Sequence, residues 1–314
     1  MLLLLIQIGG MGVVTVAVAI TMALGKKISL MQRSTMQDAI SAHQVGGIVR
    51  FTGFILKGIF LFELLGALAL MTVFVPEFGL RGIWLAVFHS VSASCNAGFD
   101  LMGTRGPFSS LTAYADHPMV NITVMALIVI GGIGFLTWQD IRRNGIHFQR
   151  YRMQSKVILT VSAVLIVLPA VYFFFFEFAR LPLPQRFWGS LFQAVTPRTA
   201  GFNTLELTAL SETGQMLTCL LMLTGGSPGS TAGGIILSRV ENLPLVTCLF
   251  ESASAVGTVG LTLGITPSLG SISRVVLICL MFFGRVGGLA LIFATLPANR
   301  NTLSKLPLEK ITVG

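Results

Sequence analysis

Long apolar runs separated by short polar loops dominate the pattern along this chain. A helix of roughly 20 apolar residues is long enough to cross a lipid bilayer. The pattern therefore predicts several crossings, one of which is interrupted by glycine. The crossings lie near residues 1–24, 52–75, 119–138, 156–178 and 271–297, and the broken one lies near 213–235.

A second kind of segment is apolar but too short to cross, and it occurs three times. Residues 82–94, 186–196 and 245–255 each predict a short helix that leads into a polar strip containing glycine. Residues 88–98 align with residues 250–260 without a gap, and a third copy begins at residue 192 with one residue deleted. Backbone outside a helix is tolerated at membrane depth only where protein buries it or where it lines a water-filled cavity. The repeat therefore predicts hairpins in which a half-helix enters the membrane and a strip returns.

The three strips have the chemistry of a cation filter. The candidate filter residues are Asn96, Ala97 and Gly98, then Thr199, Ala200 and Gly201, then Thr258, Val259 and Gly260. Glycine permits backbone conformations that strain other residues, and the carbonyl end of a half-helix favours a cation. We expect the carbonyls of the three glycines to bind K⁺. The alternative is that they are ordinary turn glycines in a chain with 34 glycines, but three in register favour the filter.

Composition and charge agree with a multi-pass membrane protein. Hydrophobic residues make up 54% of the 314 and charged residues only 11%, whereas soluble domains carry about 25% charged residues. The net charge of +9 comes largely from basic segments at 26–50, 142–156 and 300–310, which short cytoplasmic loops typically carry. This topology explains the charge without nucleic acid.

The remaining reactive residues form no catalytic or metal-binding pattern. The four cysteines show no C-x-x-C spacing, and the four histidines and sparse carboxylates suggest no catalytic set. We therefore expect no enzyme activity and no organic cofactor.

A glycine-rich run follows the strip around Gly201 and is the candidate gate. Its residues are Gly225, Gly226, Ser227, Gly229, Ser230, Thr231, Gly233 and Gly234. So many glycines and small hydroxyl residues cannot maintain a stable helix. The alternative is a helix kink that permits close packing.

Four charged or titratable residues lie at membrane depth. Arg285 is costly there and is a functional candidate, with the glycine-rich run or a carboxylate on a neighbouring helix as its partner. Glu63 is expected to pair with Lys57 or to face a wet crevice. Glu251 lies in the last short helix, where it is expected to bond strip amides or to tie the helix down, and His89 occupies the matching position.

These motifs together resemble the Trk/Ktr/HKT superfamily of potassium and sodium transport proteins, closest to the bacterial KtrB type. The resemblance is carried by residues 95–100, 196–204, 225–234, 254–262 and 283–287. It implies an all-α membrane protein with a fourfold pseudo-repeat of helix, pore helix, filter strip and helix around one pore. It also implies K⁺ uptake that is passive or coupled to Na⁺, a mobile gate loop, a homodimer, and a cytosolic nucleotide-binding regulatory ring. The alternative is an alternating-access secondary transporter of a small cation or solute.

The resemblance divides the chain into four parts. Residues 1–50 supply the inner helix of repeat one and a cytoplasmic loop, and 51–155 supply repeat two. Residues 156–235 supply repeat three with the gate loop, and 236–314 supply a partial repeat four with a tail. Gly98 and Gly201 are 103 positions apart but Gly201 and Gly260 only 59, so the fourth outer helix is expected to be missing at a junction near 235–239. The first filter would precede residue 1, because residues 9–12 match the inner-helix residues 131–134.

Overall fold

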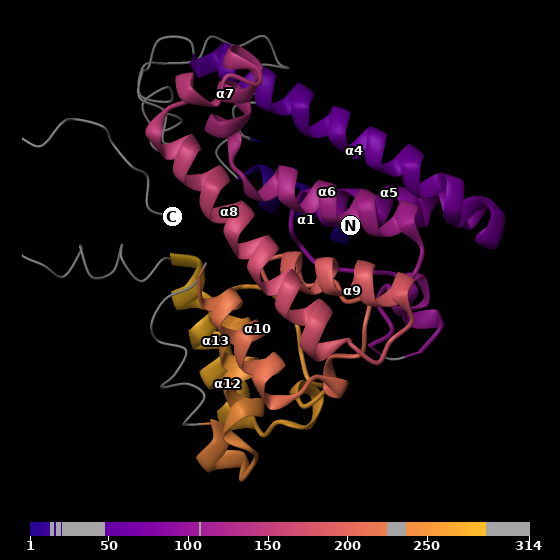
Figure 1. The fold of residues 1–314 in the computed structure, drawn as a ribbon, viewed down its shortest axis with the longest axis vertical. Coiled ribbons are helices and arrows are strands. Elements are labelled where there is room, and N and C mark those ends of the chain that lie inside the picture. Colours follow the sequence, from indigo (N-terminus) through magenta and orange to yellow (C-terminus); the bar gives the residue numbers. More distant parts are fainter. Residues whose placement is uncertain (13–15, 17–19, 21–47, 107, 225–236, 287–314) are drawn as a thin grey trace, which may run out of the picture. The chain divides into compact units, whose positions relative to one another are not determined.

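The computed structural model describes residues 1–12, 16, 20, 48–106, 108–224 and 237–286 (Figure 1). Within these ranges the regular structure is helical and contains no strand, as the sequence predicts. The chain divides into two compact units. Unit 1 comprises Met1–Arg105 with His117–Leu159, and unit 2 comprises Gly106–Asp116 with Thr160–Gly314.

Unit 1 is built around the buried helix α5, with other helices packed on it. The helices are α1 (Leu2–Met11), α4 (Ile48–Phe78), α5 (Leu80–Ser94), α6 (Pro118–Gly132) and α7 (Phe135–Asn144). The short helix α5 packs against α1, α4 and α6, and all of its residues from Phe88 to Ala93 are buried. A second apolar cluster forms where Phe51, Ile55 and Ile59 of α4 meet Trp138 of α7.

A sharp bend separates α6 from α7. The two helix axes meet at 99°, and Gly134 has a φ of +82° at the break, a value that glycine adopts without strain. Gly12 ends α1 with a φ of +81°, so the matching sequence positions share one backbone conformation. The predicted crossing at 119–138 is thus wrong as a straight span, because the chain turns after Gly132.

Glu63 of α4 has a different partner from the one the sequence suggested. Its carboxylate accepts two hydrogen bonds from Gln7 Nε2 of α1, at 2.9 and 3.1 Å, and Lys57 is not among its partners. The Ser90 hydroxyl of α5 donates to the Glu63 carbonyl oxygen at 2.6 Å. Glu63 is only 6% exposed and joins three helices of unit 1.

Replacing Glu63 with alanine is expected to lower the melting temperature of the purified protein by about 3–10 °C, because the amide of Gln7 loses its acceptor. Glutamine at the same position keeps one acceptor oxygen and is the matched control. Thermal unfolding in detergent measures both variants. Equal melting temperatures for wild type and Glu63→Ala would contradict the bridging role.

Unit 2 contains the remaining short helices. Helix α8 (Met153–Tyr172) begins in unit 1 and continues into a π-helical turn, η4 (Phe173–Glu177). The other helices are α9 (Leu183–Val195), α10 (Glu212–Leu223), α12 (Leu245–Val256) and α13 (Ser271–Val286). Helix α12 packs against both α10 and α13, and its buried Phe250 lies in a core cluster with Phe173.

Short 3₁₀ turns occur in the connections. They are η1 (Met102–Thr104), η2 (Thr112–Tyr114), η3 (Phe148–Arg150), η5 (Leu207–Ala209) and η6 (Thr266–Ser268). Residues 237–241 form one further short helical segment. Between α10 and α12, the residues that the structure describes thus include no helix as long as α4 or α8.

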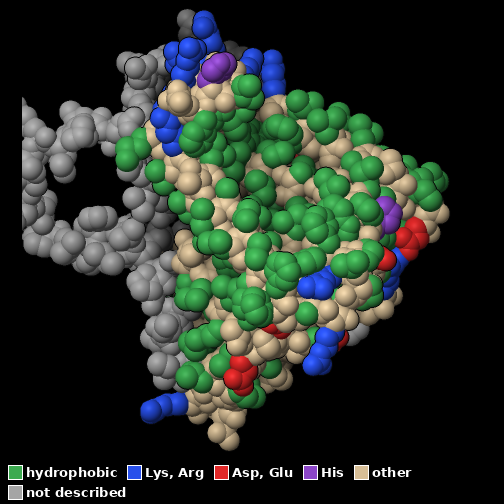
Figure 2. Space-filling model, in the orientation of Figure 1, with side chains coloured by type: hydrophobic (Ala, Val, Ile, Leu, Met, Phe, Trp, Pro, Cys, Tyr) green, Lys and Arg blue, Asp and Glu red, His purple; other side chains and the backbone are tan. Residues whose placement is uncertain are grey.

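Two described helices are long and apolar enough to cross a membrane, Arg50–Phe78 and Met153–Glu177, and the bent pair α6–α7 would make a third. Their outward faces are apolar: Leu64 and Leu68 of α4 and Val164 and Leu168 of α8 are all exposed. Figure 2 shows hydrophobic side chains over much of the viewed face, with Lys and Arg gathered at the end of unit 1 that carries α7. This distribution fits a surface that lipid covers and a basic end in water.

Candidate functional site

The three predicted strips adopt the same backbone conformation. Each glycine has a positive φ, at +70° for Gly98, +83° for Gly201 and +88° for Gly260. Two positions earlier, Asn96, Thr199 and Thr258 also have positive φ, at +50°, +65° and +52°. The residue between each pair has a negative φ, so the sign alternates along every strip. An alternating sign of φ belongs to neither a helix nor a strand, in which φ is negative at every residue.

The positive φ of the two threonines is strained. A β-branched residue in the left-handed region is a genuine outlier, and such residues persist only where the surrounding structure holds them. The same strain at matching positions of two repeats, Thr199 and Thr258, indicates that the conformation itself is required. Strained backbone is concentrated at functional sites.

A hydroxyl residue near the end of each short helix makes a hydrogen bond to the backbone of the strip. The sequence did not lead us to predict these hydroxyl residues. Ser92 donates to the Phe99 carbonyl at 2.7 Å, and Thr196 donates to the equivalent Phe202 carbonyl. Ser254 accepts a hydrogen bond from the Gly260 N–H at 3.1 Å. The signal was present in the repeat, since Ser92 and Ser254 occupy matching positions in the gapless alignment.

The short helices end where the strips begin. They end at Ser94, Val195 and Val256, within two residues of the ends that the sequence predicts. In two repeats the first turn of the strip continues from the helix through matching bonds: Ala97 N–H to the Ser92 carbonyl at 2.8 Å, and Val259 N–H to the Ser254 carbonyl at 2.9 Å. The negative ends of these helix dipoles therefore lie next to the strips.

Glycines of the next helix press against the ends of two short helices. A Cβ on Gly131 of α6 would lie 2.2 Å from the Ser94 carbonyl oxygen, and a Cβ on Gly284 of α13 would lie 2.0 Å from the Val256 carbonyl oxygen. Ser94 and Val256 stand at matching positions, each four residues before the strip glycine. Both repeats thus need glycine at the same contact, because any side chain would collide with backbone.

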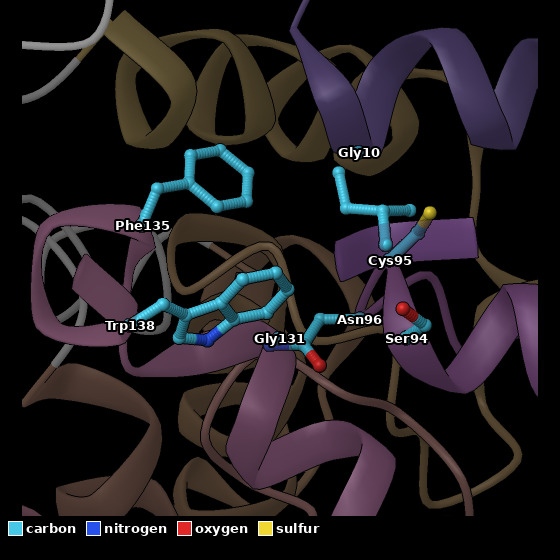
Figure 3. A pocket seen from close by; sticks show the side chains of 8 residues that line it. Gly10, Ser94, Cys95, Asn96, Gly131, Phe135 and Trp138 are labelled. Atoms are coloured by element: carbon cyan, nitrogen blue, oxygen red, sulfur yellow. The ribbon is translucent and has the colours of Figure 1, made fainter. Parts of the chain in front are cut away.

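A cavity of about 60 Å³ adjoins the first described strip in unit 1. Figure 3 shows the rings of Phe135 and Trp138 on one side of it and Gly10, Cys95 and Asn96 on the other. With its amide nitrogen as donor, Asn96 bonds the Ile128 carbonyl at 3.2 Å. The strip therefore starts from a residue that is tied to α6.

The predicted site residues divide into three groups in the structure. The strip around Gly98 lies in unit 1, and those around Gly201 and Gly260 lie in unit 2. The predicted gate residues 225–234 lie outside the described residues. Arg285 belongs to α13, but its side chain is outside the described part, so its partner stays a prediction. Within the described residues, no group of His, Cys, Asp and Glu is arranged to hold a metal ion.

Apolar helices combined with repeated half-helix and strip segments are typical of α-helical membrane transport proteins. Comparison with known proteins supports the same class, a membrane transport protein. The chain matches the TrkH family, described as a cation transport protein, over residues 1–243 and again over 236–303. The chain therefore belongs to this family of cation transporters, which are not enzymes.

Individual relatives cover nearly the whole chain. The potassium/sodium uptake protein NtpJ of Enterococcus hirae is 34% identical over 375 residues, covering 99% of this chain and 82% of the relative. The Ktr system potassium uptake protein B of Bacillus subtilis is 34% identical over 354 residues, covering 92% of this chain and 77% of the relative. The crystal structure of the potassium transporter TrkH from Vibrio parahaemolyticus has the same fold, with a TM-score of 0.60, 16% identity, and coverage of 95% of this chain and 72% of that one.

Proposed function

We propose that this chain is the pore-forming subunit of a potassium uptake system. K⁺ passes without its hydration shell along the carbonyls of the strips around Gly98, Gly201 and Gly260. The observation that carries the proposal is the alternating φ pattern that all three strips share. Two relatives that cover most of the chain are named as potassium or potassium/sodium uptake proteins, which supports the same ion.

The chemistry follows from the cost of dehydration. A cation leaves water only when oxygen ligands replace its hydration shell, and rings of backbone carbonyls do this in potassium filters. The strips offer carbonyls rather than carboxylates, so the ion is bound without a full opposite charge. Binding by dipoles is weak enough for the ion to leave again, which conduction requires.

The fourfold plan is part of the proposal. Unit 1 contains the order outer helix α4, pore helix α5, strip and inner helix α6, and α8, α9 and α10 repeat this order. The copy formed by α12 and α13 has no long helix before it among the described residues. The family matches the chain in two segments that meet at 236–243, and one alignment runs over 375 residues although this chain has 314. The two matched segments support an internal gap near residues 235–239, and the longer alignment supports positions in the relative that this chain lacks.

Further features of the uptake system follow from the family resemblance and are proposed with it. The glycine-rich run 225–234 is the gate, and Arg285 acts with it. Transport is passive or coupled to Na⁺, and the subunit is a homodimer in the bacterial inner membrane under the control of a cytosolic nucleotide-binding ring. The basic end of unit 1 is compatible with an acidic partner on the cytoplasmic side.

Cation uptake tests the proposal directly. The full-length protein is expressed in cells that lack their own potassium uptake systems, and growth on low K⁺ is measured together with the initial rate of K⁺ entry. We expect growth that empty-vector cells do not show, and K⁺ entry that a hundredfold excess of choline does not inhibit.

Two outcomes would contradict the pore. Absence of K⁺ uptake by membrane-inserted protein would overturn the proposed function. Uptake that depends on preloading the opposite side with substrate would instead favour an alternating-access transporter, because counterflow requires a carrier.

A further inference from the structure

Glu251 is a buried acid in the middle of the last pore helix. It is 4% exposed, and its described hydrogen bonds all come from neutral donors beyond the strip. The hydroxyl of Thr262 donates to Oε1, the Leu263 N–H donates to the same oxygen at 3.1 Å, and the Thr266 hydroxyl donates to Oε2 at 2.9 Å. The Glu251 side chain therefore binds three residues of the segment that follows the strip glycine Gly260.

His89 makes the corresponding contact in the other unit. It is fully buried, and its Nδ1 lies 2.7 Å from the Leu85 carbonyl oxygen, so Nδ1 carries the proton and Nε2 is the acceptor. Nε2 then accepts the N–H of Leu101 at 3.5 Å. His89 and Glu251 both lie nine residues before the strip glycine, and Leu101 and Leu263 both lie three residues after it.

The pore helix α9 departs from this arrangement. Gln193 occupies the matching position once the single deletion is allowed for, and it is also buried. Its amide donates to the Thr218 hydroxyl of α10 at 3.4 Å. The position thus carries a buried polar side chain in all three pore helices, but only two of them reach the segment beyond the strip.

We propose that Glu251 and His89 are positioning residues that hold the segment directly after their strip glycines and thereby set the preference for K⁺ over Na⁺. This inference rests on the proposed function. The Ser254 hydroxyl accepts the N–H of Gly260, and Glu251 accepts the N–H of Leu263 three residues further on. The carbonyl of the strip glycine lies between these two held N–H groups and keeps the position that suits the larger ion. When the Leu263 N–H is released, this carbonyl moves and the site contracts around the smaller ion.

The length of the side chain and its acceptor atoms do this work, not its charge. Histidine and glutamate differ in charge, but each presents an acceptor to the N–H of the leucine three residues after its strip glycine. Glu251→Gln retains an acceptor oxygen for Leu263, and its amide still reaches a threonine hydroxyl. Glu251→Ala removes all three bonds and takes away the acceptor of the partly buried Leu263 N–H.

The experiment measures K⁺ uptake with Na⁺ as competitor in cells expressing each variant at equal membrane amounts. We expect Glu251→Ala to lower the K⁺ over Na⁺ preference by about tenfold, as loss of one buried acceptor predicts, with Glu251→Gln within about threefold of wild type. His89→Ala is expected to lower the preference in the same direction, whereas His89→Gln retains it.

Glu241 provides a matched control. Its carboxylate also accepts a serine hydroxyl, that of Ser273, and a backbone N–H, that of Gly270 at 2.8 Å, but these tie the segment before α12 to the start of α13. The same two bonds, Ser273 first, lower the pKa of Glu241. Glu241→Ala is expected to leave the ion preference unchanged.

The outcomes separate this inference from the proposed function. If wild type takes up no K⁺, the proposed function fails. If wild type prefers K⁺ and Glu251→Ala prefers it equally, the positioning role is overturned.

If Glu251→Ala does not reach the membrane, the Thr262→Val, Thr266→Val double variant decides, because it removes the hydroxyl bonds and keeps the Leu263 contact. We expect the double variant to show a weaker preference for K⁺ than wild type and Glu241→Ala, and a stronger one than His89→Ala. If the preference is unchanged in both the double variant and His89→Ala, the inference is overturned.

Discussion

Gly260→Ser is expected to reduce the preference for K⁺ over Na⁺ by about five- to thirtyfold, from a strain of about 1–2 kcal/mol in the strip. Gly260 has a φ of +88°, which a residue with a Cβ avoids. A Cβ there would meet no atom within 4 Å, so the effect does not come from a steric clash. The strip instead relaxes its backbone and turns a carbonyl away from the ion. Competition between K⁺ and Na⁺ for uptake measures the change.

Gly145→Ser is the matched control for this strain. Gly145 caps α7 with a φ of +55° and a ψ of −131°, a combination that is restricted to glycine, and a Cβ there also meets no atom within 4 Å. We expect lower stability with an unchanged ion preference. If both variants changed the preference equally, general destabilisation would explain the result and the strip would have no special role.

Gly131→Ala is expected to have the second large effect, a loss of stability and of K⁺ uptake together. The new Cβ would lie 2.2 Å from the Ser94 carbonyl oxygen, which is backbone at the end of α5 and cannot rotate aside. Overpacking of this kind costs about 1–3 kcal/mol, occasionally more. The end of α5 must move, and the strip that begins there moves with it. Thermal unfolding and uptake rate are measured on the same preparation.

Gly53→Ala provides the opposite expectation. Gly53 lies within α4, where a Cβ meets no atom within 4 Å, and alanine is favoured over glycine in a helix by about 0.5–1 kcal/mol. Its melting temperature should stay the same or rise. A Gly131→Ala variant as stable and active as Gly53→Ala would mean that α5 and α6 do not pack as described.

Much of the helical layout was predictable from the chain. The apolar runs at 52–75 and 156–178 correspond to α4 and to α8 with η4, because a long apolar segment has few alternatives to a membrane helix. The short segments at 82–94, 186–196 and 245–255 became α5, α9 and α12 within a few residues. The matching strips were visible as a repeat, and their shared backbone conformation supports that prediction.

Contacts between segments that are distant in the sequence could not be predicted as well. Glu63 was expected to pair with Lys57, six residues away, or to face a wet crevice, but its partner is Gln7 of another helix. The bend after Gly132 was also missed, because Gly134 sits inside an apolar run in which hydropathy alone predicts continuation. Neither the pattern of apolar residues nor local propensity specifies which helix a buried polar group meets.

The sequence by itself determined the membrane class, the order of the long apolar helices and short helices along the chain, and the positions of the glycines that follow the short helices. It did so because hydrophobic length and glycine spacing are properties of local sequence. Only the tertiary structure decided which groups hold the strips: Ser92, Thr196 and Ser254 at the pore-helix ends, and the contact of Glu251 with Leu263. A serine hydroxyl in an apolar helix has several available acceptors, and the fold selects one of them by bringing the returning chain within hydrogen-bonding distance.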